Sequence, residues 1–366
     1  MELFSRLPDV RRIAVLRGGG IGDVLFAVPA LHALHAAYPD ASLTVLSTRP
    51  GHLLEGRLPF PVRVLELPRV PGVCEAPDAS DDVEGFFAAL RAERLDLALQ
   101  LHGGGRNSNP FLLNLGARHT VGSRTPDAPA LERSIDYVYF QHEFVRGLEV
   151  AALAGAAPVT LEPALRALPS DDGAGADASP AAPGERLVAL HPGARDPRRR
   201  WPAEKFGRVA RALAAEAGVR VAVVGDTGER GLAQQVCAAA ASDRVVNLAG
   251  TLSMPALVGL LARAALFVGN DSGPRHLAQA LGAPTAAVFW FGNVITAAPL
   301  SRGAHRVRMS MRGTCPVCGA DQTQVGWTAP RCEHDVSFVA DVAVDDVLED
   351  ARALLDARDD GTRRRD

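Results

Sequence analysis

The stretch from residue 267 to 284 reads FVGNDSGPRHLAQALGAP and holds residue types that suit the binding of a phosphate group. An apolar run over residues 264–268 meets a Gly-Asn-Asp-Ser-Gly-Pro turn, after which apolar residues return at helical spacing. Asp271 and Ser272 are both good N-caps, and Pro274 suits a first helical turn. The pattern therefore predicts a strand, a tight turn and a helix.

Such a turn presents free N–H groups and the positive end of a helix dipole, which favour a phosphate or pyrophosphate. Gly273 allows a ligand to approach the backbone closely, and His276 falls where it could add a donor. The alternative is an ordinary capped turn followed by a surface histidine. The rest of the chain must decide between the two interpretations.

A second glycine-rich turn, RGGGIGD at residues 17–23, follows an apolar run at residues 12–16 and precedes helical spacing. The spacing of a dinucleotide-binding loop fails, because the third glycine position after Gly18 and Gly20 is occupied by Asp23. A P-loop is excluded because no Gly-Lys-Ser/Thr follows. The remaining interpretation is a flexible loop that presents one carboxylate, that of Asp23. The alternative is that Asp23 simply caps the helix.

Anion binding in this chain must rely on arginine, because Lys205 is the only lysine. Arginine offers a fixed fork of donors that matches phosphate or carboxylate. Arg195, Arg199 and Arg200 cluster after an expected strand, where they could hold a nucleotide diphosphate. Glu229 is placed to accept hydrogen bonds from ribose hydroxyls, or to complement a helix dipole in a first turn.

Four motifs together resemble glycosyltransferase family nine, the bacterial ADP-heptose:lipopolysaccharide heptosyltransferases. They are RGGGIGDVLFAVPAL, HPGARDPRRRWPAEKF, VVGDTGERG and FVGNDSGPRHLAQALGAP, in the family's order and spacing over nearly the whole chain. The resemblance implies an α/β fold of GT-B type, with two Rossmann-like domains whose parallel sheets face each other across a cleft. It also implies metal-independent transfer with inversion, from an ADP-sugar donor to a lipid-linked oligosaccharide acceptor, without a required cofactor.

The resemblance also assigns roles to individual residues. Asp23 matches the general base, Glu229 matches the ribose carboxylate, and Arg199 stands where the family usually has a lysine beside the donor phosphates. Because arginine keeps the charge, this difference need not abolish donor binding, but it leaves the donor's identity open. The remaining expected contacts are Arg200, Asp271, Ser272, Gly273 and His276 for the donor, and Arg17 and Gly22 for the acceptor.

Five cysteines do not indicate a disulfide framework, and three of them lie close together near the C-terminus. Cys315, Cys318, Cys332 and His334 have spacing compatible with a structural Cys₃His zinc site, and Gly319 follows the first pair. The alternative is a set of reduced thiols without metal. Cys74 and Cys237 are isolated and read as small apolar residues.

Apolar runs and helical spacing alternate along both halves of the chain, which predicts parallel sheets with right-handed crossovers. Pro29 should break or kink the first helical stretch. A turn after the fourth expected strand, at residues 102–108, should lie at the carboxyl edge of its sheet, where ligands bind. Expected strands cover residues 12–16, 42–47, 62–67, 95–101, 118–122, 187–190, 220–224, 245–248, 264–268 and 285–289.

Composition suggests how these elements divide into domains. Residues 1–168 are expected to form an acceptor-binding domain and residues 186–343 a nucleotide-sugar-binding domain. Residues 169–185 have almost no large apolar side chain and read as a linker. Residues 344–366 read as a C-terminal helix with a charged, disordered end.

Composition also limits where the chain works and what it binds. A hydrophobic content of 47% and a charged content of 22% indicate a globular protein, and no run is long enough for a membrane span. The N-terminus lacks a secretory pattern, so we expect a cytoplasmic protein. A net charge of -3 argues against general nucleic-acid binding. The lipid nature of the implied acceptor suggests peripheral contact with the inner face of the inner membrane.

Other functions remain open at this stage. The same fold could use another nucleotide sugar or acceptor, because a fold does not fix a substrate. A catalytically inactive nucleotide-binding protein would not need Asp23, the arginines and the turn at Asp271 together. A nicotinamide oxidoreductase is disfavoured by the failed glycine spacing.

Overall fold

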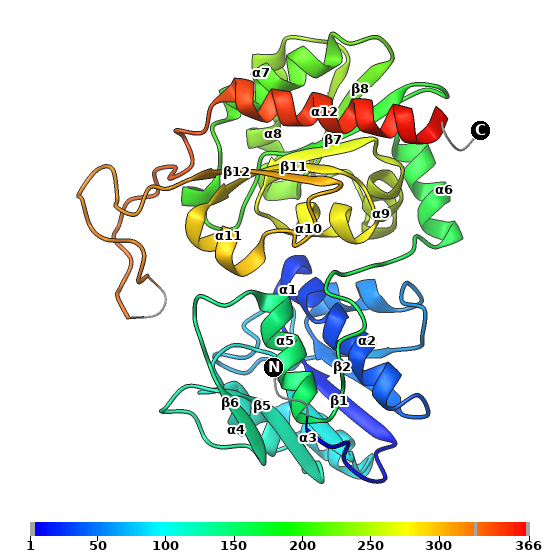
Figure 1. The fold of residues 1–366 in the computed structure, drawn as a ribbon, viewed down its shortest axis with the longest axis vertical. Coiled ribbons are helices and arrows are strands. Elements are labelled where there is room, and N and C mark those ends of the chain that lie inside the picture. Colours follow the sequence, from blue (N-terminus) through cyan, green and yellow to red (C-terminus); the bar gives the residue numbers. More distant parts are fainter. Residues whose placement is uncertain (1–3, 326–327, 364–366) are drawn as a thin grey trace. The chain divides into compact units, whose positions relative to one another are not determined.

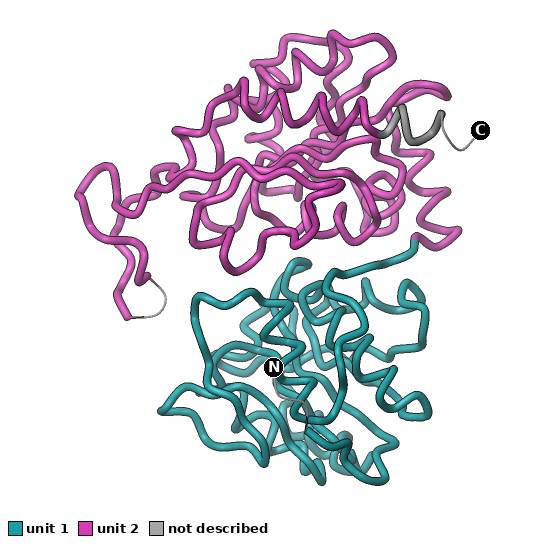
Figure 2. The backbone as a smooth tube through the Cα atoms, viewed as in Figure 1, with its two compact units in different colours: residues 1–166 teal, residues 167–366 magenta. Residues whose placement is uncertain are grey.

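The computed structural model describes residues 4–325 and 328–363. Two compact units make up the chain, and the boundary between them lies between Arg166 and Ala167 (Figure 2). Each unit has its own sheet and its own helices. The segment expected as a linker and the C-terminal helix both belong to the second unit.

Within its described residues, the first unit contains one sheet of six parallel strands in the order β3-β2-β1-β4-β5-β6 (Figure 1). This order is that of a dinucleotide-binding Rossmann sheet, with its switch point between β1 and β4. Apolar side chains fill the central strands because a parallel sheet is buried on both faces. The strands are β1 (Arg12–Leu16), β2 (Ser42–Ser47), β3 (Arg63–Glu66), β4 (Leu97–Gln100), β5 (His119–Arg124) and β6 (Arg133–Asp136).

The helices of the first unit connect these strands. Pro29 lies in the first turn of α2, directly after the break that ends α1, as its lack of an N–H predicts. The helical elements are α1 (Ile21–Phe26), α2 (Val28–Ala37), the 3₁₀ helix η1 (Arg49–Leu54), α3 (Val83–Ala92), α4 (Ser108–Leu113) and α5 (Glu143–Leu153).

The second unit repeats the arrangement, with six parallel strands among its described residues in the order β12-β11-β10-β7-β8-β9. Its switch point lies between β7 and β10. The strands are β7 (Arg186–His191), β8 (Val219–Val223), β9 (Val245–Asn247), β10 (Leu266–Asn270), β11 (Thr285–Trp290) and β12 (His305–Ser310).

The helices of the second unit surround this sheet, and α12 packs on its core through Val347, Ala351 and Leu354. In the described part of the chain, no helix is both long and apolar enough to cross a bilayer. The helical elements are α6 (Pro169–Ala178), the 3₁₀ helices η2 (Pro197–Arg199) and η3 (Thr227–Glu229), α7 (Ala203–Ala214), α8 (Arg230–Ala240), α9 (Met254–Arg263), α10 (Gly273–Ala280), α11 (Phe291–Ala297) and α12 (Val344–Arg363).

The expectation of a linker at residues 169–185 is wrong for its first ten residues, which form α6. The helix packs on α9 so closely that a Cβ added to Gly175 would collide with the backbone at Gly259. Asp171 is fully buried and caps the helix by accepting a hydrogen bond from the Leu168 N–H at 2.8 Å. Small side chains here serve close helix packing, although their low hydrophobicity resembles that of a flexible segment.

Two strands were absent from the sequence expectations, β6 and β12. Both are edge strands, and both carry charged residues, as in RSID and HRVRMS. An edge strand is half exposed, so it lacks the continuous apolar run of a buried strand. Residues 361–366 were expected to be disordered, which is wrong for residues 361–363 because they belong to α12, and residues 364–366 lie outside the described residues.

Candidate active site

Asp23 lies in the first turn of α1, directly after the glycine-rich turn that leaves β1 at the switch point of the first sheet. Gly19 has φ +105°, a conformation that favours glycine, and Gly20 is the N-cap of α1. Asp23 Oδ2 accepts a hydrogen bond from the Gly20 N–H at 2.9 Å, so Asp23 does cap the helix. Its side chain nevertheless remains 39% exposed. The capping role and an exposed carboxylate are therefore compatible.

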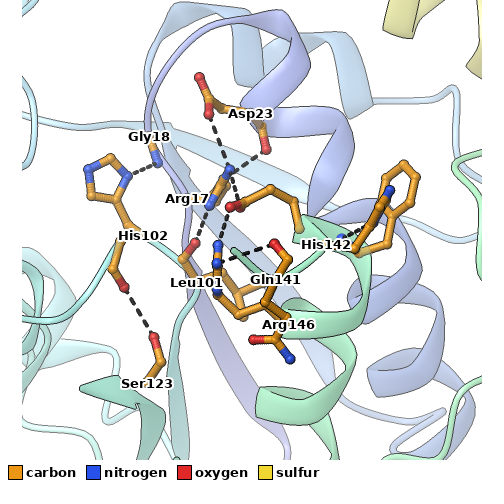
Figure 3. Close-up of polar contacts among 12 residues, drawn as sticks. Arg17, Gly18, Asp23, Leu101, His102, Ser123, Gln141, His142 and Arg146 are labelled. Carbon is orange, nitrogen blue, oxygen red and sulfur yellow. Dashed lines mark hydrogen bonds and ion pairs between the residues drawn. The ribbon is translucent and has the colours of Figure 1, made fainter. Parts of the chain in front are cut away.

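Arg17 fixes this carboxylate from below (Figure 3). Its Nε donates to the Asp23 carbonyl oxygen at 2.8 Å, and its Nη2 lies 3.1 Å from Asp23 Oδ1. The same Nη2 lies 3.0 Å from Oε2 of Glu143, at the start of α5, and Nη1 donates to the Leu101 carbonyl. Arg17 is only 7% exposed, so this buried charge is paired on both sides.

The ion pairs continue from Glu143 to Arg146, which contacts the second oxygen of the same carboxylate. Arg146 also donates to the Val138 carbonyl at 2.6 Å and stacks over the Tyr137 ring, 4.4 Å from its centroid. Charges therefore alternate from Asp23 through Arg17 and Glu143 to Arg146. A small pocket beside this row is lined by Arg17, Phe26, Ala27, Leu101, Ser123, Glu143, Arg146, Gly147 and Val150.

His102 follows β4 and supports the same glycine turn. Its Nδ1 accepts a hydrogen bond from the Gly18 N–H at 3.2 Å (Figure 3). Burial, followed by the nearby charge of Arg17, lowers the pKa of His102 below its ordinary value. Of the polar residues further along this turn, Ser108 is buried and donates to the His102 carbonyl, whereas Arg106 extends into solvent.

In the second unit, the turn after β10 places Asp271 in a buried set of ionic contacts. Asp271 Oδ2 lies 3.0 Å from Arg199 Nη1, and Oδ1 lies 3.1 Å from His276 Nε2. Burial opposes ionisation of Asp271, but the hydrogen bond from His276 and the charges of Arg199 and Arg275 outweigh it and lower the pKa of Asp271. Asp271 is therefore a charged group that orients an arginine.

His276 lies beneath this turn and is 4% exposed. Its Nε2 faces Asp271, and its Nδ1 contacts the guanidinium of Arg275. The ring is therefore held between a carboxylate and a guanidinium. The alternative of a surface histidine is therefore wrong, because the ring is buried. The expected contact of His276 with a donor phosphate stays a prediction.

Ser272 is the N-cap of α10, with Gly273 and Pro274 in the first turn, as the sequence predicts. Among the described residues its hydroxyl makes no capping bond, because Oγ lies 2.9 Å from His191 Nδ1 instead. The first-turn N–H groups of α10 therefore lack the side-chain cap that commonly satisfies one of them. This is the feature of a helix that suits an anion.

His191, at the end of β7, connects Ser272 to Glu229. Its Nε2 lies 3.0 Å from Glu229 Oε2, and that carboxylate also accepts from the Asp226 N–H at 3.0 Å. Burial raises the pKa of Glu229, but the hydrogen bond with His191 and further contacts outweigh this and give a net lowering. His191 was missed as a site residue from the sequence, although it opens the HPGARDPRRRWPAEKF motif.

The arginines that follow β7 include the three predicted to hold phosphate, Arg195, Arg199 and Arg200, and they lie in different environments. Arg199 is 27% exposed beside Asp271, and Arg200 donates through Nε to the Ala194 carbonyl at 2.9 Å. Arg195 is exposed, whereas Arg198 is buried and paired with Asp196. The structure therefore brings Arg199 to the turn at Asp271, and Arg198 supports the turn from behind.

Cys315, Cys318, Cys332 and His334 also come together, as their spacing predicts. Each offers one ligand atom, and these four atoms lie within 4.8 Å of one another. All five cysteines are free thiols, and the other two are Cys74 in the core of the first unit and Cys237 on α8 of the second. The sequence-based grouping of these four residues is therefore matched by the structure.

A family model for glycosyltransferase family 9 (heptosyltransferase) matches residues 83–322, which is most of the chain. The chain belongs to this family. The resemblance found in the four motifs is confirmed, and the protein is a glycosyltransferase. Family 9 membership also decides against a nicotinamide oxidoreductase.

Individual members of family 9 align over nearly the full length. Lipopolysaccharide heptosyltransferase 2 of Salmonella typhimurium is 25% identical over 94% of this chain and 98% of its own. The solved ADP-heptose heptosyltransferase II of Escherichia coli has a TM-score of 0.74 at 20% identity, covering 96% of this chain and 100% of its own. A family 9 structure from Veillonella parvula has a TM-score of 0.75 at 18% identity, covering 97% and 98%. The predicted α/β fold of GT-B type, with two Rossmann-like domains, is confirmed.

Proposed function

We propose that this glycosyltransferase moves a heptosyl group from ADP-heptose to a hydroxyl of a lipopolysaccharide-core acceptor, with inversion at the anomeric carbon. The family and the names of its aligned relatives support the donor and the acceptor. The observation that carries the proposal is the placement of two polar clusters. Each lies at the switch point of its own sheet, where open α/β sheets bind ligands.

The donor is proposed to bind to the second unit. Arg199 and Arg200, together with the N–H groups at Ser272 and Gly273, would hold the pyrophosphate. Glu229, held by His191 at 3.0 Å, would accept from the ribose hydroxyls. In this arrangement Asp271 orients Arg199, and His276 orients Asp271.

Negative charge builds on the pyrophosphate as the glycosidic bond breaks. Arginine and helix N–H groups aimed at that charge stabilise the transition state more than the ground state. Because Arg199 is already oriented by Asp271, little reorganisation is required when the charge develops. The proposed chemistry of the second unit is therefore leaving-group stabilisation.

The acceptor is proposed to bind to the first unit, near Arg17 and Gly22, with Asp23 as general base. An ionised carboxylate has about four lone-pair sites, so the contacts with Gly20 and Arg17 leave sites for an acceptor hydroxyl. The exposed part of the side chain can receive that proton as the hydroxyl attacks the anomeric carbon. No metal or cofactor is assigned a step in this mechanism.

A panel of sugar nucleotides with a heptose-deficient core oligosaccharide tests the proposal. We expect nucleoside diphosphate release and a heavier acceptor with ADP-heptose, and an inverted anomeric linkage in the product by NMR. Nucleoside diphosphate release from a different sugar nucleotide would identify that compound as the donor. A different donor is the leading alternative, because Arg199 stands where the family usually has a lysine. Binding of ADP without transfer to any acceptor would instead indicate a catalytically inactive nucleotide-binding protein.

A lipid-linked acceptor would bring the enzyme to the inner face of the inner membrane, and we propose peripheral contact there from the cytoplasm. Basic residues near the N-terminus offer little support, because Arg11 pairs with Asp40 and Arg12 with Asp96. Co-sedimentation with vesicles that contain the lipid-linked acceptor, compared with acceptor-free anionic vesicles, measures this. Binding to neither kind of vesicle would contradict it.

A further inference from the structure

The cluster of Cys315, Cys318, Cys332 and His334 has the composition and closeness of a tetrahedral metal site. Its ligand atoms lie within 4.8 Å of one another, and they come from two segments separated by a 13-residue loop. Zinc with Zn–S of about 2.3 Å in a tetrahedron places its sulfur ligands about 3.8 Å apart. Contraction by about one ångström would therefore complete the site.

The first pair lies in a turn already shaped to present two sulfurs. Gly319 has φ +72°, and its N–H donates to the Cys315 carbonyl at 2.9 Å. Cys315 N–H donates to the Ala320 carbonyl at 2.9 Å, and the backbone N–H groups of Val317 and Cys318 contact the Cys315 sulfur. A glycine after the second cysteine is what such a tight turn requires.

The fourth residue carries an independent sign of a missing ligand. Nδ1 of His334 is shielded from solvent, and among the described residues it has no hydrogen-bond partner. A buried polar atom left in this way is costly unless something binds it. A disulfide between two of the cysteines would leave the third thiol and this imidazole unsatisfied, whereas a Cys₃His metal site uses all four.

We propose that these four residues form a structural zinc site. Three thiolates and one imidazole are ligands that zinc prefers, and four protein ligands leave no open position for substrate or water. The role is therefore to hold the loop between β12 and α12, drawn in orange in Figure 1.

The loop that zinc would hold packs directly behind the arginine turn of the proposed donor site. Gln322 lies between the two ligand pairs and accepts from Arg198 Nη1 at 2.8 Å. After the second pair, Ser337 Oγ donates to the Arg200 carbonyl at 2.6 Å, and Phe338 N–H donates to the Arg198 carbonyl at 2.7 Å. Residues between the two ligand pairs and residues after the second pair therefore both contact the turn that carries Arg199.

Metal content of the full chain, purified under reducing conditions without added metal or a histidine tag, tests the site. We expect about one zinc per chain by mass spectrometry, and its loss in Cys318→Ser. Cys318 is the exposed ligand, so Cys318→Ser has the best prospect of folding. Cys332→Ser is the second variant. Cys237→Ser on α8 is the matched control and should keep its zinc.

Cobalt substitution gives a second readout that does not depend on activity. The cobalt protein should show thiolate charge-transfer absorption and the strong d–d bands of a tetrahedral site, both lost in Cys332→Ser. Four outcomes would each overturn the proposal. They are metal-free protein with five titratable thiols, a disulfide within the cluster, iron in place of zinc, and zinc retained in both variants.

The consequence for the arginine turn rests on the proposed function. Cys318→Ser should raise the Kd for ADP several-fold by calorimetry, while Cys237→Ser should not. If wild-type protein contains zinc but binds no ADP, the donor assignment fails and the zinc site stands. If ADP binds equally well with and without zinc, the connection to the donor turn is wrong.

Discussion

Arg17 holds Asp23 through two different atoms of that residue. Its Nε donates to the Asp23 carbonyl oxygen at 2.8 Å, and its Nη2 lies 3.1 Å from Oδ1. Backbone and side chain of the proposed base are therefore fixed by one buried guanidinium. A lysine would have to make both contacts from a single nitrogen, because it lacks the planar fork. The carboxylate is oriented before any substrate binds.

Replacing Asp23 with asparagine tests its role as the base. Asp23→Asn keeps a side-chain oxygen for the capping bond with Gly20 but removes the proton acceptor. We expect kcat to fall by roughly 10²–10⁴-fold, the usual contribution of general base catalysis, with an unchanged Kd for ADP. Asp40→Asn, at an exposed position of the same unit, is the control. Turnover close to the wild-type rate would end the assignment.

Gly19→Ala tests whether the glycine turn positions Asp23. A Cβ at Gly19 would meet the Asp23 carboxylate, and its φ of +105° adds strain. Gly116→Ala, at φ +68° in the same unit, also places an alanine at positive φ but meets Arg91 only at 3.5 Å. We expect each to destabilise by about 1–3 kcal/mol, while only Gly19→Ala lowers kcat. Equal kcat in the two variants would show that the turn does not control the carboxylate.

Arg199→Ala tests the donor site. Losing a charged hydrogen bond to the pyrophosphate costs about 1.5–3 kcal/mol of binding free energy, so the Kd for ADP should rise by roughly 10–150-fold. Arg208→Ala removes an exposed arginine from α7 of the same unit and controls for the change in net charge. Calorimetry on both variants measures the difference. Comparable Kd values would place the pyrophosphate elsewhere.

The sequence was a good guide where local chemistry decides the structure. Buried parallel strands are continuous apolar runs, so β1, β2, β10 and β11 were recognisable, and Pro29 marked a helix break. The same holds for Ser272 as N-cap and for the glycine turn at Asp23. These features depend on residues that are neighbours in the chain.

The partners of the site residues were not predictable, because they are distant in sequence. Glu143 lies 126 positions from Arg17, and His191 lies 38 positions from Glu229. Sheet topology brings these pairs together, and no pattern around Glu143 distinguishes it from other acidic residues in a first helical turn. His191 carried one signal, its place directly after a strand in a recognised motif.

Burial also decides where two side chains of the second unit point. His276 lies between Asp271 and Arg275, two contacts that the sequence did not predict, and its expected contact with a donor phosphate stays a prediction. Arg198, the first residue of the arginine run and one without a predicted role, turns to Asp196 and Gln322. The direction of a side chain depends on tertiary packing, which residue type and spacing do not specify.

His102 should make the stability of the first unit sensitive to acid. Burial and the Arg17 charge lower the pKa of His102 from its ordinary 6.5, so below that pH the unfolded chain binds more protons than the folded one. The contribution of His102 to stability is therefore fully present above pH 6.5 and is lost as the pH falls through the lowered pKa. Protonated Nδ1 can no longer accept from the Gly18 N–H, which loosens the turn that carries Asp23.

His102→Asn keeps an acceptor near Nδ1 but cannot be protonated, so its Tm should fall less than that of the wild type between about pH 7.5 and about pH 5. His52 supplies a control of opposite sign. A hydrogen bond with Glu55 raises the pKa of His52, so its contribution is present at low pH and is lost as the pH rises. His52→Asn should therefore steepen the acid loss that His102→Asn reduces. Identical pH profiles for His102→Asn and the wild type would mean that His102 does not titrate with folding.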